Sequence, residues 1–288
     1  MRQLKAKSSS SNRIATIVVA ILIAVQPTLA ADLEPATVSA FNRYAHLTQD
    51  AFDVANKNLS QFMSIDRLPP ERRKSSYAQL RQGQVVIERL ETLDAGKPVP
   101  VPGGIIHHWI GTVFIPGATL SQVLAFEEDY NHQQEHFSPS VVRSRLLSHK
   151  GDDYIVEIRF REKKVIAVVL DTVHQAHYDQ IDATHAWSRS WTTQIQQVDH
   201  PGEASETLEP EGHDGGFLWR MNTYWRFEQK DGGTYVESQS VSLTRDIPTG
   251  LGWLIGPYVT SVPRESLEFM LARTREAILE RSQTRGAN

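Results

Sequence analysis

The order of segments in the last two thirds of the chain most constrains its fold. Segments that read as strands run from about residue 105 to 245, and a single amphipathic helix follows at residues 263–280. In that helix one stripe is formed by Leu267, Met270, Leu271, Thr274 and Ile278, with Arg and Glu residues opposite. An antiparallel sheet that curves around one helix encloses a cavity, so this order favours a protein that binds a small molecule.

Period-two alternation of apolar and polar residues predicts the strands. They fall at residues 85–93, 105–115, 141–149, 154–161, 165–178, 183–198, 217–229 and 234–245. Most breaks between them are short and polar or contain Gly, which is typical of hairpins between antiparallel neighbours. Helices are predicted at 119–130 and, as a short turn, through Phe137 before Ser138-Pro139; residues 200–216 are predicted to form a long exposed loop. The predicted fold class is α+β, with a curved antiparallel sheet wrapped around the long C-terminal helix.

The first thirty residues have the pattern of a secretory signal peptide. Four basic residues precede the apolar run 14–25, and small residues stand before Ala31. The alternative, a retained membrane anchor, is disfavoured because twelve apolar residues fall short of the ~20 that span a bilayer as a helix. The expected location is secreted or periplasmic, with no stable membrane span once the segment is removed.

The charge and the cysteine count narrow the classes of partner. Removal of the first thirty residues leaves 26 basic and 34 acidic residues, so the formal net charge moves from −4 to −8. An acidic chain lacks the basic surface that nucleic acids require, so no nucleic-acid partner is expected. The chain has no Cys, so its stability must come from an apolar core rather than from disulfides.

A helical arm is predicted ahead of the main domain. The expected division is a signal peptide at 1–30, a helical arm at 31–82 and the main domain at 83–288. The arm contains helices at 34–64 and 71–81, separated by Leu68-Pro-Pro70. We expect the arm to pack against the outside of the main domain; the alternative is a partner-binding role.

Several motifs resemble the START/SRPBCC superfamily, which has the helix-grip fold. Residues 104–120 (GIIHHWIGTVFIPGATL), 126–130 (FEEDY) and 137–147 (FSPSVVRSRLL) resemble the first strand, the helical pair and the entry to the next strand of such domains. Residues 242–253 and 261–267 resemble exported bacterial members of uncharacterised function. The resemblance covers about residues 85–280 and implies a hydrophobic cavity between the sheet and the C-terminal helix. It transfers no active site, because members of this superfamily bind many kinds of ligand and only some are enzymes.

One motif matches a metal site. His132-Gln-Gln-Glu-His136 fits the pattern of inverted zinc peptidases, in which the two His bind zinc and the Glu is the base. Ser138-Pro139 ends any helix directly after it, and no downstream helix supplies a third ligand, so no metal is predicted. His107 and His108 are adjacent in a strand and point to opposite faces, as do His174 and His177, so neither pair can chelate.

Aromatic and Arg residues on two predicted strands supply candidate ligand contacts. In strand 183–198, one face carries Trp187, Arg189 and Trp191, and the other carries Ser188, Ser190 and Thr192. An Arg beside Trp rings can form cation–π contacts, and a buried Arg needs a carboxylate such as Glu237 beside Arg220 or Arg226. The alternative is that the aromatic faces pack under the N-terminal helices. The predicted ligand-binding residues are His107, His108, Trp187, Arg189, Trp191, Arg220, Tyr224, Arg226, Glu237, Trp253 and Met270.

The leading functional prediction is an exported carrier or sensor that binds a hydrophobic or amphiphilic small molecule and is not an enzyme. Nucleophilic catalysis finds no support, because the chain has no Cys, no Gly-x-Ser-x-Gly elbow and no phosphate-binding loop. One alternative is a cyclase or hydratase that uses cavity His, Arg and Glu residues as acids and bases. A second is a scaffold whose helical arm binds a protein partner. No cofactor is predicted, and Gly250, Gly252, Gly256 and Pro257 are expected to form a hinge before the C-terminal helix.

Overall fold

A computed structural model describes residues 31–163, 167–247 and 252–286, with the side chains of the last helix placed at 260–282. The main sheet has nine strands, and eight of them follow the order β2-β5-β13-β12-β9-β8-β7-β6, while β10 pairs with β9. All its pairings are antiparallel. The strands of this order are β2 (Val86–Arg89), β5 (Gly104–Pro116), β6 (Val141–Lys150), β7 (Asp153–Lys163), β8 (Ala167–Gln180), β9 (His185–Asp199), β12 (Arg220–Lys230) and β13 (Gly233–Arg245).

Short elements complete the chain. Pairs of two-residue strands are β1 (Ala31–Asp32) with β11 (His213–Asp214), and β3 (Leu93–Asp94) with β4 (Lys97–Pro98). Thr207–Leu208 forms β10, inside the segment that the sequence predicts as an exposed loop. Between β5 and β6 lie α4 (Leu120–Glu127) and α5 (Gln133–Phe137), as the sequence predicts.

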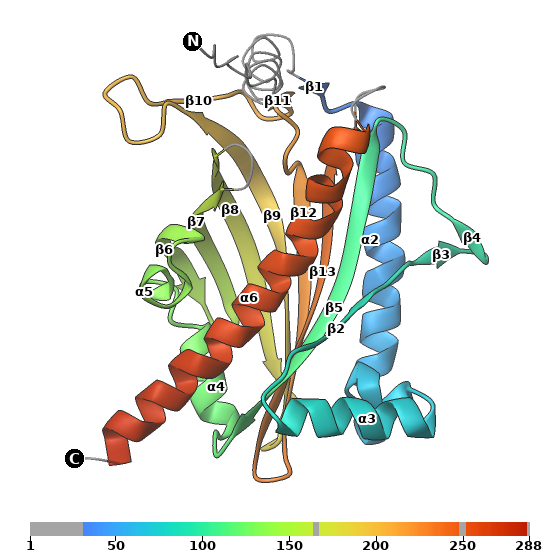
Figure 1. Ribbon diagram of the computed structural model, residues 1–288, viewed down its shortest axis with the longest axis vertical. Helices are drawn as coiled ribbons and strands as arrows, with labels where there is room; N and C mark the ends of the chain where they lie inside the picture. The colour runs from blue at the N-terminus through green and yellow to red at the C-terminus, as the bar shows by residue number, and fades with distance from the viewer. Residues whose placement is uncertain (1–30, 164–166, 248–251, 287–288) are drawn as a thin grey trace, which may run out of the picture.

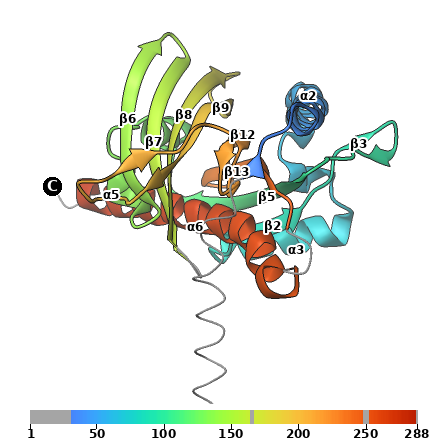
Figure 2. The ribbon, with the colours of Figure 1, turned by 90° about the horizontal axis from the view of Figure 1, so that it is seen from above.

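The sheet curves around the C-terminal helix α6 (Gly252–Gly286), which crosses it diagonally (Figure 1). Seen from above, α6 and the N-terminal helix α2 (Pro35–Asn56) lie on opposite sides of β13 and β5 (Figure 2). We call the side of the sheet that faces α6 the inner face and the side that faces α2 the outer face. This arrangement confirms the predicted α+β class and the predicted resemblance to the helix-grip fold.

The helix α6 approaches the sheet most closely over β5. An added Cβ on Gly111 would lie 2.6 Å from Leu271 Cδ1, so any larger residue there would force the Leu271 side chain to shift. Leu267 and Leu271 are buried there in the main core together with residues of β5, β12 and α4. The predicted apolar stripe of the C-terminal helix is therefore the stripe that packs on the inner face.

The helical arm covers the outer face over β5, β12 and β13. Phe41, Tyr44 and Phe52 of α2 pack on Tyr224 and other apolar residues of β12 and β13. A second helix, α3 (Pro70–Arg81), buries Leu80 in a cluster with Phe114 and Tyr235. The arm thus packs against the outside of the main domain, and its apolar side is occupied by the sheet.

Two predicted helix boundaries are wrong. The helix predicted at 34–64 ends at Asn56, and two 3-10 turns, η1 (Leu59–Gln61) and η2 (Ser64–Arg67), follow. These turns bring the Ser64 backbone N–H within 2.8 Å of the Glu237 carboxylate, a contact that a continuing helix would not make.

The C-terminal helix begins at Gly252 instead of residue 263, and it continues through Pro257 and Pro263, although a proline inside a helix normally kinks or ends it. Gly252, Gly256 and Pro257 are therefore helical and do not form the predicted turn, and Gly250 lies outside the described residues. Neither α6 nor any other helix in the described ranges combines the length and the hydrophobicity needed to cross a bilayer. The predicted signal peptide also lies outside these ranges.

Candidate functional site

The centre of the inner face is lined by small hydroxyl side chains. Paired residues of neighbouring strands share a face, so the register places these side chains side by side across four strands. The band consists of Thr172 on β8, Ser188, Ser190 and Thr192 on β9, Thr223 on β12, and Ser238, Ser240, Ser242 and Thr244 on β13. Ser190, Thr223 and Ser240 are only half-buried, so solvent reaches the middle of this hydroxyl band.

One row across the sheet joins the hydroxyl band to the α6 contact. It runs from Gly111 under α6 through Ser238, Trp225 and Ser188 to Tyr178. Ser238 is fully buried, and its Oγ has no hydrogen-bond partner within the described residues. Trp225 beside it is only partly buried. A buried hydroxyl without a partner is uncommon in a folded protein.

Two buried histidines border the hydroxyl band. His107 lies 3.1 Å from the Thr244 hydroxyl, and His174 lies 2.8 Å from the Thr172 hydroxyl. Burial lowers the pKa of each imidazole to about 4, and for His107 the nearby Arg89 adds to the shift. Both rings are therefore neutral at neutral pH and offer one donor and one acceptor each.

A buried carboxyl group lies at the α4 end of the inner face. Glu127 of α4 is buried in the main core, and its Oε1 lies 3.4 Å from the Thr274 hydroxyl of α6. Burial raises the pKa of Glu127 to about 8, and the Thr274 hydrogen bond opposes the shift. Nearby, the Tyr130 and Tyr178 hydroxyls are 2.7 Å apart. At neutral pH this cluster therefore contains a protonated carboxyl beside two phenols.

The raised pKa of Glu127 predicts a pH-dependent stability. Between the ordinary value of 4.5 and about 8, the unfolded chain ionises while the folded chain keeps its proton, so stability falls as the pH rises. Glu127→Gln removes this pH-dependent loss. We measure the change that the substitution causes in the free energy of unfolding by urea. We expect this change to be a few kcal/mol more favourable at about pH 8.5 than at about pH 4.5.

The matched control is Glu276→Gln on the exposed side of α6, where the carboxylate pairs with Arg273. It should shift the unfolding free energy by no more than about 0.5 kcal/mol at either pH. An effect of Glu127→Gln that does not change with pH would contradict the assigned protonation.

Most of the predicted ligand-binding residues lie on the outer face, under the helical arm. Arg226 and Glu237 form a buried ion pair, with 2.8 Å between Nη1 and Oε1. Asn56 Oδ1 and the Phe52 carbonyl accept further bonds from the guanidinium. Burial lowers the pKa of Arg226, and Glu237 counteracts this shift. The pair therefore joins α2 to the sheet and does not face α6.

Three other predicted residues of the outer face also have their polar groups bound to other parts of the protein. His108 lies between the Tyr44 hydroxyl and the Gln239 amide, each 2.8 Å away. Tyr224 donates to the Ala45 carbonyl of α2. Arg220 pairs with Glu211, so of the two proposed partners of Glu237 only Arg226 is the right one.

Strand β9 turns its aromatic side outward. Trp187 packs edge-on against Phe52, Arg189 lies over the Trp187 ring, and Trp191 is exposed. This is the alternative in which the aromatic side packs under the N-terminal helices. Of the predicted residues, the inner side holds His107 and Met270, which packs on the main core; the side chain of Trp253 lies outside those described.

The two histidines of the His132-to-His136 motif do not converge. His132 precedes α5 and lies 2.6 Å from the Asp129 carboxylate, while His136 lies 2.7 Å from Arg281 of α6. Among the described residues, no three His, Cys, Asp or Glu side chains are grouped so that they could hold a metal ion.

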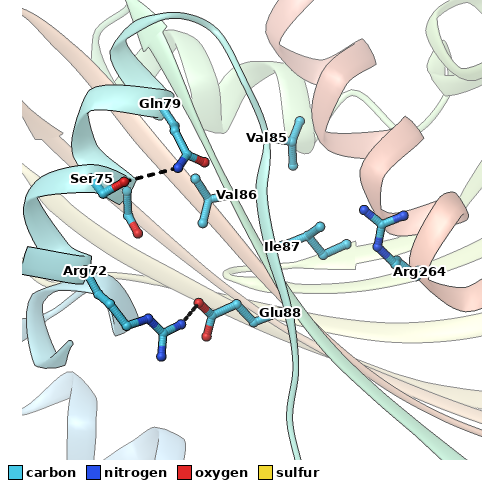
Figure 3. A pocket seen from close by; sticks show the side chains of 9 residues that line it. Arg72, Ser75, Gln79, Val85, Val86, Ile87, Glu88 and Arg264 are labelled. Carbon is cyan, nitrogen blue, oxygen red and sulfur yellow. Dashed lines mark hydrogen bonds and ion pairs between the residues drawn. The ribbon is translucent and has the colours of Figure 1, made fainter. Parts of the chain in front are cut away.

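Two surface grooves flank the edge of the sheet at β2. The smaller has a volume of about 360 Å³ between α3, β2 and α6, and Figure 3 shows Arg72 paired with Glu88 on one side and Arg264 on the other. The larger, about 670 Å³, follows β5 where β2 leaves it and is lined by Tyr44, Arg89, Val101 and Ile106 among others. Both are open surface features outside the hydroxyl band.

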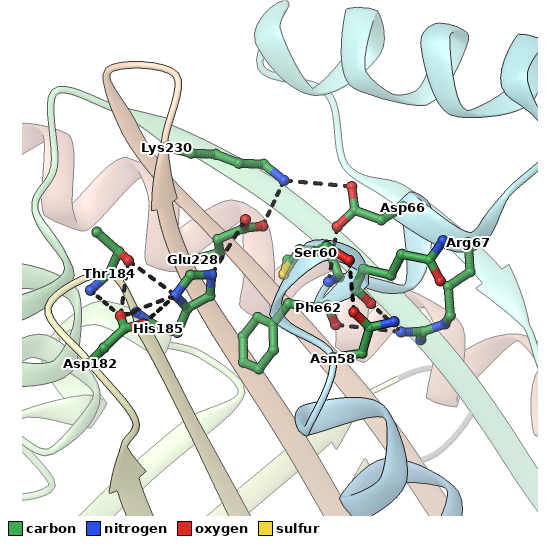
Figure 4. Close-up of polar contacts among 12 residues, drawn as sticks. Asn58, Ser60, Phe62, Asp66, Arg67, Asp182, Thr184, His185, Glu228 and Lys230 are labelled. Carbon is green, nitrogen blue, oxygen red and sulfur yellow. Dashed lines mark hydrogen bonds and ion pairs between the residues drawn. The ribbon is translucent and has the colours of Figure 1, made fainter.

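A polar network lies on the outer face where β9 begins and β12 ends (Figure 4). His185 lies 3.0 Å from Asp182 and 3.7 Å from Glu228, and Lys230 bridges Glu228 to Asp66 of η2. Burial raises the pKa of Glu228. The network ties the turns after α2 to the ends of β9 and β12, so its role is structural.

Comparisons with known proteins give likenesses of fold alone. No protein-family model and no curated protein sequence matches the chain. The solved structure of TTHA0849 from Thermus thermophilus is 15% identical with a TM-score of 0.43, over 62% of this chain and 99% of that one. The Zhui aromatase/cyclase from Streptomyces sp. R1128 is 12% identical with a TM-score of 0.42, over 62% and 96%. A STAR-related lipid transfer protein from Xanthomonas axonopodis is 17% identical with a TM-score of 0.39, over 66% and 98%.

Proposed function

We propose that this helix-grip protein binds an amphiphilic small molecule on the inner face of its sheet, between the hydroxyl band and α6, outside the cytoplasm. The observation that carries the proposal is the buried, unpartnered Ser238 hydroxyl beside the partly buried Trp225. A core that served stability alone would place larger apolar side chains at these positions.

The surroundings of the hydroxyl band suit such a ligand. Apolar residues flank it on both sides, with Val113 and Phe227 near α4 and Val156 and Ile158 on β7. Ligand sites combine such apolar walls, which supply most of the affinity, with a few polar groups that fix orientation. A molecule with an apolar body and one polar end matches this division.

Binding can be tested with a neutral hydrophobic fluorophore, N-phenyl-1-naphthylamine, whose emission rises in an apolar site. We expect saturable binding to the intact protein, and Ser190→Phe should abolish it by filling the half-buried centre of the hydroxyl band. Native mass spectrometry of protein isolated from its own source would then show a bound small molecule.

The matched control is Ser148→Phe, the same exchange at an exposed position of β6. It should leave the fluorophore affinity unchanged, and thermal unfolding must show that both variants fold. Equal loss of binding in the two variants, or no binding by the unmodified protein, would refute the proposed site.

A second candidate function, acid–base catalysis of the cyclase or hydratase type, is favoured by one observation. Glu127 is protonated at neutral pH and lies near the Tyr130 and Tyr178 hydroxyls, which form a ready donor cluster. The test compares the small molecules that co-purify with the unmodified protein and with Glu127→Gln. If the compounds bound to the two proteins differ by one water molecule, catalysis is supported. If they are identical, the protein binds the compound without converting it.

A further inference from the structure

We infer that the ligand of the inner face is uncharged and presents oxygen atoms, as an alcohol, ketone or ester does, and is not an ionised lipid. The inference rests on the proposed function and specifies its ligand class. It follows from the chemistry of the side chains that face α6.

No ionised side chain faces α6 along the central strands. Within the described residues 105–115, 172–178, 186–192, 221–227 and 234–244, no Asp, Glu, Lys or Arg lies on the inner face. The charged residues of these segments, such as Arg189, Arg226 and Glu237, project to the outer face. An anionic head group bound at the hydroxyl band would therefore be buried without a cation, which is strongly unfavourable.

An exposed cation stands at the rim of the inner face. Arg89 on edge strand β2 pairs with Trp109 in the register. It contributes to the lowered pKa of His107, but it borders the inner face and does not enter the hydroxyl band.

Hydroxyl groups are well suited to a neutral, oxygen-bearing ligand because each can donate and accept. Part of the band is already satisfied internally, since Ser190 bonds Thr223 at 2.8 Å and Thr192 accepts from the Met221 backbone. Ser238 is not, and its Oγ is free to donate to a ligand oxygen. The buried imidazoles of His107 and His174 and the carboxyl of Glu127 add neutral groups, because burial shifts the pKa of each toward its uncharged form.

The experiment compares 1-decanol with decanoate, which have the same chain length and differ in head-group charge at neutral pH. Each displaces N-phenyl-1-naphthylamine from the intact protein, and we expect decanoate to bind at least about tenfold more weakly than decanol. Ser238→Ala should weaken decanol severalfold and leave the fluorophore affinity unchanged. Ser240→Arg, at the half-buried position of the same strand, should reverse the preference in favour of decanoate.

The possible outcomes distinguish a failure of the neutral-ligand inference from a failure of the proposed binding function. Decanoate binding as tight as decanol would overturn the neutral-ligand inference while leaving a binding protein; loss of that binding in Arg89→Gln would show the rim cation to be the cause. Failure of all three probes to bind would remove the proposed function and the inference with it. A decanol affinity that Ser238→Ala does not change would overturn the assignment of that hydroxyl.

Discussion

Replacing Arg226 by methionine is expected to lower the free energy of unfolding by about 3–5 kcal/mol. The side chains of Arg226 and Glu237 are only 2% and 1% exposed, so the substitution leaves the Glu237 carboxylate charged and buried. Ser64 would still donate to that carboxylate, but no cation would remain in contact with it. Urea unfolding followed by tryptophan fluorescence measures the loss.

Two further variants separate the ion pair from the packing of the side chain. Arg220 lies on the same strand as Arg226, and Arg220→Met removes its exposed pair with Glu211. This substitution should lower the free energy of unfolding by at most about 1 kcal/mol. The double variant Arg226→Met with Glu237→Met should recover much of the loss, because no uncompensated charge remains. A cost below about 1 kcal/mol for Arg226→Met alone would show that Glu237 becomes neutral or hydrated in the variant.

Leu271→Ala is expected to cost about 2–5 kcal/mol. Leu271 is fully buried, and it lies over Gly111 at the closest approach of α6 to the sheet. The glycine has no side chain that could move into the space, so the cavity would persist. Chemical denaturation of the variant gives the value.

Leu147→Ala on edge strand β6 is the matched control, since this leucine is 45% exposed. Its effect should stay within about 0.5 kcal/mol. Equal losses of unfolding free energy in Leu271→Ala and Leu147→Ala would mean that the packing of α6 on the sheet does not depend on the contact over Gly111.

The strands can be predicted because their alternation of apolar and polar residues is visible in the sequence itself. The predicted hairpin strands agree with β6 to β9 to within a few residues at each end. The end of α2 cannot be predicted in this way, because it is followed by a tertiary contact: the Ser64 N–H donates to Glu237 across the fold. Local propensity does not contain this contact. The start of α6 is missed because Pro257 and Pro263 predict the end or a kink of a helix, whereas α6 continues through both.

The candidate site is predictable in part. Alternation correctly separates Trp187, Arg189 and Trp191 from Ser188, Ser190 and Thr192, but it does not say which side faces the C-terminal helix. An aromatic side and a hydroxyl side are equally acceptable against a packed helix, and in the structure the aromatic side of β9 faces away from α6. The signal that points the other way is the run of small hydroxyls at alternate positions 238–244 of β13.

The burial of Glu127 cannot be predicted from the sequence, for a different reason. It stands in a run of two Glu and one Asp before Tyr130, a pattern typical of an exposed helix end. Its burial depends on α6 crossing α4, with Thr274 as the partner, and these residues are separated by most of the main domain. Only the folded arrangement distinguishes Glu127 from its neighbours in the sequence.

The burial of β13 has a consequence for recognition. Every residue from Gly233 to Thr244 except Ser240 is buried, because α6 and the arm cover the strand from its two sides. Its amide hydrogens should therefore exchange with solvent among the slowest in the protein, through global unfolding only. The hydroxyls of Ser238 and Ser242 thus sit on a backbone that is fixed before any ligand arrives, and binding costs little ordering of the protein there.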